Sequence, residues 1–114
     1  MADDVIYINE EDGLKRMMNN GALFSKLLIK FKNDTNMEAV EAAFGKEDLE
    51  NAKTSAHTLK GLAANLSLME LYKQVLELEN QLKAGTFNSD QLALVKDVYS
   101  QTLIETDKVI EKYA

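Results

Sequence analysis

The only histidine of the chain, His57, has neighbours that are unusual for a residue involved only in packing. Lys60 follows three residues later and Gly61 stands directly after it, within the stretch SAHTLKGLAANL at 55–66. Glycine in a helix interior costs about 1 kcal/mol relative to alanine, so its presence calls for a reason. Neutral imidazole is a competent nucleophile near pH 7. A histidine flanked by a lysine and a small residue fits a site that carries an anion, and the chemistry fits a phosphoryl group held on a ring nitrogen.

A helical wheel of the segment around the histidine separates His57 from the predicted core. One face collects apolar residues at helical spacing, namely Leu49, Ala52, Ala56, Leu59, Ala63 and Leu66. His57 lies about 140° from the centre of this stripe, so its ring is predicted to point into solvent. The face that carries His57 also carries polar or very small residues, namely Glu50, Lys53, Thr54, Lys60, Gly61 and Ala64.

The rest of the chain reads as a series of helices joined by short connections. Predicted helices cover about 10–18, 21–32, 37–44, 46–66, 68–84 and 89–113. Thr35 and Ser67 each precede a glutamate by three residues, a capping-box pattern that predicts a helix start. Short connections make consecutive long helices antiparallel neighbours, so we expect an all-α, up-and-down antiparallel four-helix bundle.

Composition excludes several classes of function. The chain of 114 residues suggests one domain over 1–114, and its 13 basic and 19 acidic residues give a net charge of −6, which disfavours nucleic-acid and anionic-membrane binding. It has no cysteine for disulfides or thiolate metal sites, and one imidazole is too few for a zinc site. The start, MADDVIYINEEDG, lacks the basic and apolar regions of a signal peptide, and no apolar run is long enough to span a bilayer. We therefore expect a cytoplasmic protein.

The stretch AHTLKGLAANL resembles the motif of histidine-containing phosphotransfer (HPt) domains, A-H-x-L-K-G followed by small residues. GLKRMMNNGALFSKLLIKF at 13–31 is similar to the family's N-terminal helix pattern, so the resemblance covers about 8–112. It implies a four-helix bundle with accessory N-terminal helices. It also implies that His57 is the phosphoryl acceptor, that Lys60 is its charge partner and that Gly61 gives access. Ser67 stands where many members have glycine, and we expect it to cap the following helix.

The resemblance implies partners as well as a fold. An HPt protein is an intermediate of a multistep phosphorelay, with response-regulator receiver domains and a hybrid sensor histidine kinase as partners. We expect a monomer without a cofactor of its own, with Mg²⁺ on the receiver. The docking face around His57 is predicted to include Lys53, Thr54, Ala64 and Asn65. No G-x-x-x-x-G-K-[ST] loop is present, so the chain is predicted to carry phosphate without taking it from ATP.

Several alternatives remain open from the sequence. The turn near Ser67 brings Glu79 opposite His57, where it either holds one ring nitrogen protonated or pairs with an exposed lysine. The pair Met17–Met18 is interpreted as core packing rather than a ligand set. Leu23, Leu27, Phe31 and Phe44 are interpreted in the same way, with partner docking for any that stays exposed. The alternative function is a non-phosphorylated helical-bundle adaptor that sequesters a receiver or kinase domain.

Overall fold

The computed structural model describes residues 5–113, which form six α-helices. Their bounds are α1 Glu10–Arg16, α2 Gly21–Lys32, α3 Asn36–Gly45, α4 Leu49–Asn65, α5 Met69–Lys83 and α6 Ser89–Tyr113. The single domain predicted over 1–114 includes residues 1–4 and 114, which lie outside the described residues. No helix in the described range is long and apolar enough to cross a membrane.

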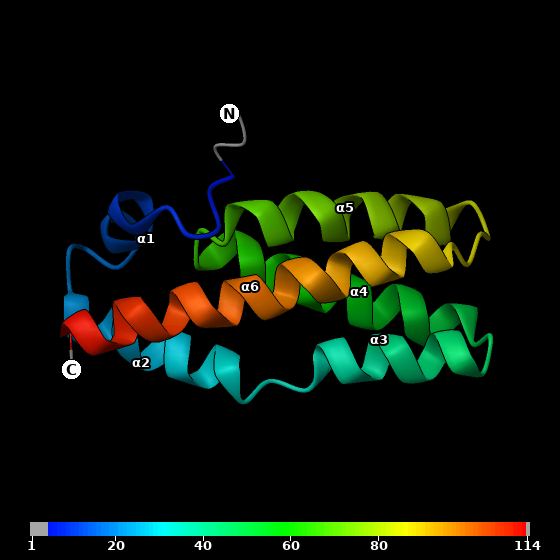
Figure 1. The fold of residues 1–114 in the computed structure, drawn as a ribbon, viewed down its shortest axis with the longest axis horizontal. Helices are drawn as coiled ribbons and strands as arrows, with labels where there is room; N and C mark the ends of the chain where they lie inside the picture. The colour runs from blue at the N-terminus through cyan, green and yellow to red at the C-terminus, as the bar shows by residue number, and fades with distance from the viewer. Residues whose placement is uncertain (1–4, 114) are drawn as a thin grey trace.

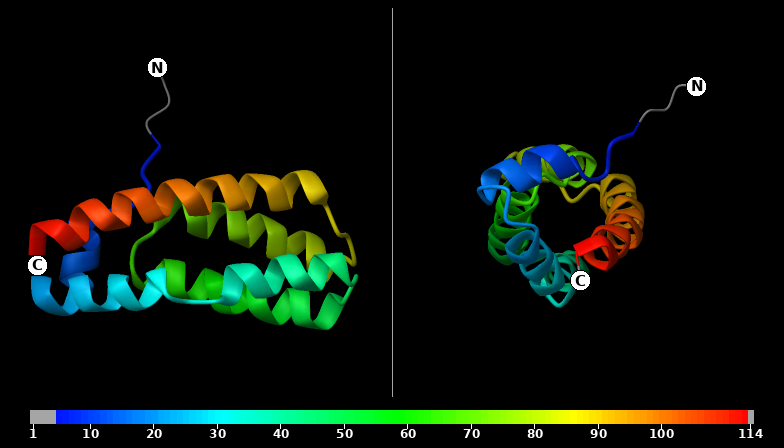
Figure 2. Two further views of the ribbon diagram at one scale, coloured as in Figure 1. Left: turned by 60° about the horizontal axis from the view of Figure 1, so that its bottom comes forward. Right: turned by 90° about the vertical axis from the view of Figure 1, so that its left-hand side faces the viewer.

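The helices form a bundle of four rods, and rods that follow one another along the chain run in opposite directions (Figure 1). Helices α2 and α3 lie end to end and make one interrupted rod, while α4, α5 and α6 make the other three, as the end view of Figure 2 shows. The short helix α1 lies across one end of the bundle and contacts α2. The predicted all-α, up-and-down four-helix bundle is confirmed, with α1 as its accessory N-terminal helix.

The predicted apolar stripes of α4 and α5 are the core of the bundle. Buried side chains with helical spacing are Ala52, Ala56, Leu59, Ala63 and Leu66 on the first, and Leu68, Leu71, Val75, Leu78 and Leu82 on the second. Core packing was expected for Met17, Met18 and Leu23 and holds only for Met17, so the docking alternative left open for exposed residues applies to Leu23. Phe24 is fully buried while Leu23 is exposed, and Met17 packs against the core while Met18 is 90% exposed. Helix α1 ends at Arg16, and Met18 lies in the turn that follows, with a positive φ of 56°.

Both capping-box predictions were wrong, although both helix starts exist. Thr35 stands before α3 without a side-chain capping bond, and Asp34 accepts the hydrogen bond from the amide of Asn36 at 2.9 Å instead. Ser67 adopts a positive φ of 58° in the turn between α4 and α5, and Leu68 is the residue that precedes α5. From this turn Ser67 Oγ donates a hydrogen bond to Asp12 Oδ2 at 2.5 Å, which ties the turn to α1.

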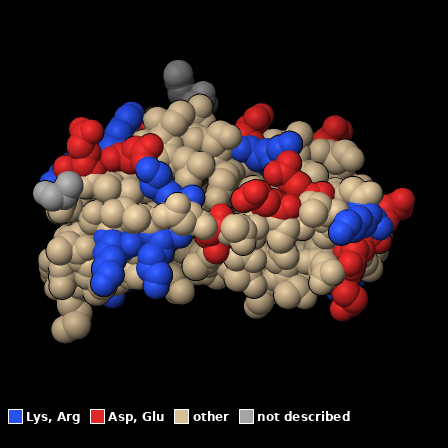
Figure 3. Space-filling model, turned by 90° about the horizontal axis from the view of Figure 1, so that it is seen from below, with Lys and Arg blue, Asp and Glu red and all other residues tan. Residues whose placement is uncertain are grey.

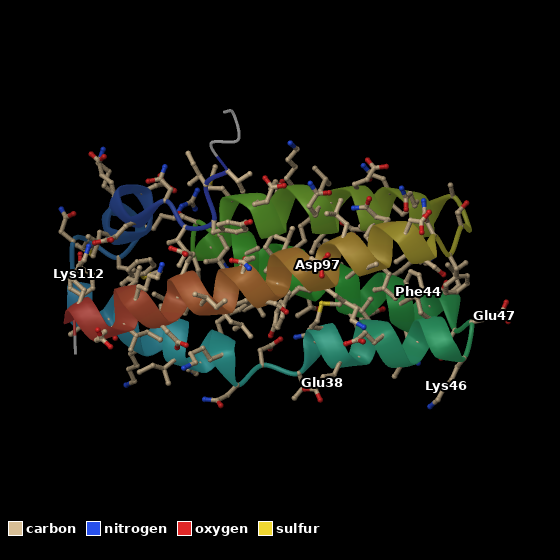
Figure 4. All side chains as sticks on the ribbon, viewed as in Figure 1. Glu38, Phe44, Lys46, Glu47, Asp97 and Lys112 are labelled. Atoms are coloured by element: carbon tan, nitrogen blue, oxygen red, sulfur yellow. The ribbon has the colours of Figure 1, made fainter. Side chains whose placement is uncertain are left out.

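Phe44 and Lys112, labelled toward opposite ends of the bundle in Figure 4, each take part in a contact between distant elements. At one end, the rings of Phe44 and Phe87 pack edge-on with their centroids 5.2 Å apart, and this contact joins the end of α3 to the loop before α6. At the other end, Lys112 Nζ lies 2.9 Å from Glu10 Oε1, which joins the end of α6 to α1. These contacts join α3 to the loop before α6 at one end, and α6 to α1 at the other.

Candidate functional site

Helix α4 presents His57 to solvent from its middle. The helix begins after Asp48, whose side chain accepts a hydrogen bond from the Asn51 amide at 3.1 Å. Its core stripe is buried against the other rods, so the opposite face is free, and the His57 side chain is 70% exposed. One turn further on, a Cβ added at Gly61 would meet no other atom within 4 Å. The surface beside the imidazole is therefore open, as the wheel predicted.

A buried carboxylate from α5 holds one side of the imidazole. Glu79 Oε2 lies 2.8 Å from His57 Nδ1, and the Glu79 side chain is only 3% exposed. Its other oxygen, Oε1, lies 2.6 Å from Lys60 Nζ, and Lys83 Nζ lies 3.8 Å from Oε2. Glu79 is therefore the centre of a cluster in which a single carboxylate faces an imidazole and two ammonium groups. The sequence left open whether Glu79 contacts His57 or pairs with a lysine, and in the structure it does both.

The electrostatics of the cluster favour an ionised Glu79. Burial by itself would raise the pKa of Glu79, but Lys60 and then His57 and Lys83 outweigh it, so the pKa lies below its ordinary value. An ionised carboxylate accepts hydrogen bonds only, so the hydrogen of the neutral imidazole sits on Nδ1 and is donated to Glu79. The lone pair is then on Nε2, the nitrogen opposite the one held by Glu79. The arrangement can present a nucleophilic Nε2 to a partner.

The other residues predicted for the site lie around this cluster. Thr54 and Asn65 are exposed, and Ala64 is half-buried. Lys53 is half-buried and its Nζ lies 3.0 Å from Glu50 Oε2. Lys60 was expected beside the phosphoryl group; its side chain is 19% exposed and is directed to Glu79. Lys83 was not predicted as a site residue, although its spacing of four residues from Glu79 on one helix is a signal that predicts contact.

A groove beside the histidine face was also missed. It has a volume of about 600 Å³ between the end of α1, α2 and the second half of α4, and is lined by Arg16, Met17, Leu27, Lys30, Phe31, Asp34, Leu62, Asn65 and Leu66. Helix α2 carries three lysines and no acidic residue, whereas α3 carries Glu38 and Glu41. Figure 3 shows a group of basic side chains over the α2 part of this face, while acidic side chains lie at both ends of the bundle. Only packing brings α1, α2 and α4 together here, so no local pattern could reveal it.

Residues 30–105 match the Hpt domain family. The matched range is more than half of the chain and includes the whole cluster around Glu79. The match begins at residue 30, so most of the N-terminal pattern at 13–31 lies outside it. No curated protein and no solved structure matches the chain. Hpt domains carry phosphoryl groups on histidine in phosphorelays, are not kinases, and interact with receiver domains and histidine kinases. On the strength of this match and of the geometry around its single histidine, the chain belongs to the Hpt domain family.

Proposed function

We propose that the protein is an intermediate of a multistep phosphorelay. His57 accepts a phosphoryl group from the aspartyl phosphate of one receiver domain and passes it to another receiver domain. A hybrid sensor histidine kinase supplies the first receiver. The observation that carries this proposal is the exposed imidazole whose Nδ1 is held 2.8 Å from the buried carboxylate of Glu79.

The proposed transfer is an in-line displacement at phosphorus. The Nε2 lone pair of His57 attacks the phosphorus, an N–P bond forms, and the bond from phosphorus to the aspartate oxygen breaks. The aspartate leaves as a carboxylate. Because Nδ1 keeps its hydrogen, the ring becomes positively charged, and the ionised Glu79 at 2.8 Å compensates this charge. In the second transfer the N–P bond breaks and the ring leaves as neutral imidazole, so the same carboxylate supports both directions.

Lys60 and Gly61 support this chemistry in different ways. The ammonium of Lys60, 2.6 Å from Glu79 Oε1, keeps the carboxylate ionised and adds positive charge beside the phosphoryl group. Gly61 leaves open space one turn from the ring, where the partner's aspartate and its Mg²⁺ must approach in line. The Mg²⁺ belongs to the receiver, and the proposal gives this chain no cofactor.

The receiver is proposed to dock on the exposed face of α4. This face includes Lys53, Thr54, Ala64 and Asn65 around the histidine. Asn65 also lines the groove between α4 and α2, so the face continues into an apolar surface bordered by the Lys30 ammonium. An acidic receiver active site complements a small-residue surface with a basic border, which favours fast and selective association.

The alternative is an adaptor that binds a receiver or kinase without carrying phosphate. Such a module needs the bundle surface but has no use for a buried carboxylate that orients an exposed imidazole. The cluster of His57, Glu79 and Lys60 therefore favours the phosphorelay reading.

The deciding experiment incubates the purified protein with receiver domains labelled by radioactive acetyl phosphate. The native protein is expected to gain acid-labile, base-stable label, and His57→Gln is expected to stay folded and unlabelled, because the side chain is 70% exposed. ATP and Mg²⁺ alone are expected to give no label. Binding of receivers without any label on the native protein would support the adaptor instead, and label on His57→Gln would place the acceptor at another residue.

A further inference from the structure

The two lysines that contact Glu79 differ in how firmly they are held. Lys60 Nζ lies 2.6 Å from Glu79 Oε1, and its side chain is 19% exposed. Lys83 Nζ lies 3.8 Å from Oε2, and its side chain is 61% exposed. Oε2 is also the oxygen that contacts His57 Nδ1. Lys60 is therefore the close partner of the carboxylate, whereas Lys83 is an exposed cation at the edge of the cluster, 3.8 Å from the oxygen that contacts the ring.

The charges of the cluster show what it lacks. Around the neutral imidazole there is one carboxylate, Glu79, and there are two ammonium groups, Lys60 and Lys83, so positive charge is in excess. A phosphoryl group brings up to two negative charges and three strong acceptor oxygens. Lys60 cannot turn toward it without giving up its contact with Oε1 of the buried Glu79, while the other oxygen, Oε2, contacts the imidazole. Lys83 can, because its ammonium is exposed and lies 3.8 Å from Glu79 Oε2, a longer and weaker contact than the 2.6 Å contact of Lys60.

We propose that Lys83 is the cation that binds the phosphoryl group on His57. On phosphorylation its ammonium moves from Glu79 to a phosphoryl oxygen, while Lys60 remains with Glu79. This assignment rests on the proposed function, because it requires phosphate on His57. Lys83 then stabilises the phosphorylated state by neutralising charge that would otherwise favour loss of the group to water. It comes from α5, so the phosphoryl group is held between two helices.

The test uses the full chain and phosphoramidate, a small donor that needs no receiver. The donor's P–N bond breaks, ammonia leaves and the N–P bond to His57 forms, so labelling is separated from docking. After removal of the donor, the half-life of phosphohistidine is followed by ³¹P NMR. For Lys83→Gln we expect a half-life shorter by about three- to tenfold, as for loss of a charge-assisted hydrogen bond, with Lys83→Arg within about twofold of the native protein.

The control is Lys73→Gln, which removes the same charge from an exposed position about 15 Å away along α5. We expect it to leave the half-life unchanged. Thermal unfolding of the unphosphorylated Lys83→Gln protein should match the native curve, which separates a phosphate contact from a structural role. A native half-life in Lys83→Gln, or an equal loss in Lys73→Gln, would overturn the assignment while leaving the proposed function intact. Failure of phosphoramidate and of phosphorylated receivers to label native His57 would overturn both.

Discussion

Glu79 Oε2 lies 2.8 Å from His57 Nδ1, although the two residues are 22 positions apart and belong to different helices. The antiparallel hairpin of α4 and α5 makes this contact possible, because the turn between Asn65 and Met69 is short. Glu79 is also the only carboxylate that is buried within residues 5–113. A single side chain thus fixes the imidazole and depends on Lys60 for its own charge balance, so its removal should affect both stability and transfer.

Glu79→Ala tests this double dependence. The change leaves the half-buried Lys60 ammonium without its counter-ion and the imidazole without its acceptor, so we expect a loss of about 1–3 kcal/mol in the free energy of unfolding. Phosphoryl acceptance from a receiver should fall in parallel. The matched control is Glu77→Ala on the exposed side of the same helix, expected to lie within about 0.5 kcal/mol of the native protein. Urea unfolding measures both, and equal stability of the two variants would contradict the prediction.

The pH dependence of stability offers a second test of Glu79. Its pKa in the folded protein lies below the ordinary value of 4.5, so the ionised form stabilises the fold above that value. This contribution is lost as the pH falls through the lower folded pKa. Glu79→Gln has no such titration. The difference in the free energy of unfolding between native protein and variant should therefore be largest near neutral pH and shrink as the pH falls below the ordinary value of 4.5.

Urea titrations at a series of pH values provide this comparison. Glu10 and Asp12, whose pKa values are also lowered, titrate in both proteins and cancel in the difference. A difference that stays constant across the range would mean that Glu79 does not gain stability from being ionised.

Gly61→Gln separates access from stability. A Cβ at this position meets nothing within 4 Å, and glutamine has a higher helix propensity than glycine, so stability should be unchanged or rise by up to about 1 kcal/mol. Transfer from a phosphorylated receiver should nevertheless fall by at least about tenfold, because the side chain obstructs the in-line approach one turn from His57. Gly45→Gln, at another helical glycine with open space, is the control for transfer. Unimpaired transfer in Gly61→Gln would place the partner's approach on another side.

The turn at Ser67 predicts a particular order of stabilities. Its positive φ of 58° disfavours a Cβ, while its hydroxyl donates to Asp12 at 2.5 Å. Ser67→Ala loses the hydrogen bond and keeps the backbone strain, so we expect a loss of about 1–3 kcal/mol. Ser67→Gly loses the same bond but relieves the strain, which recovers roughly 1 kcal/mol. In thermal unfolding, the native protein should be the most stable, Ser67→Gly the next and Ser67→Ala the least stable. If Ser67→Ala is as stable as the native protein, the role given to the hydroxyl is contradicted.

Much of this protein was determined by the sequence through local periodicity. The apolar stripe of α4 required His57 to point away from the core, because residues spaced three and four apart share one face of a helix. The same rule applied to α5 placed Glu79 at the edge of its stripe, and the short turn put that edge opposite the histidine. The all-α bundle followed from helix periods and short connections.

The tertiary structure decided what depends on register and on contacts between distant elements. Whether Glu79 was exposed or buried depended on how closely α4 and α5 pack, and this packing determined that Lys60 pairs closely with it while Lys83 remains exposed. Ser67 fits a capping pattern, yet its backbone geometry and its bond to Asp12 follow from where α1 lies. A local pattern fixes which face of a helix is apolar. It carries no information on which residues of another helix will meet the polar edge of that face, because that is set by the packing of the whole bundle.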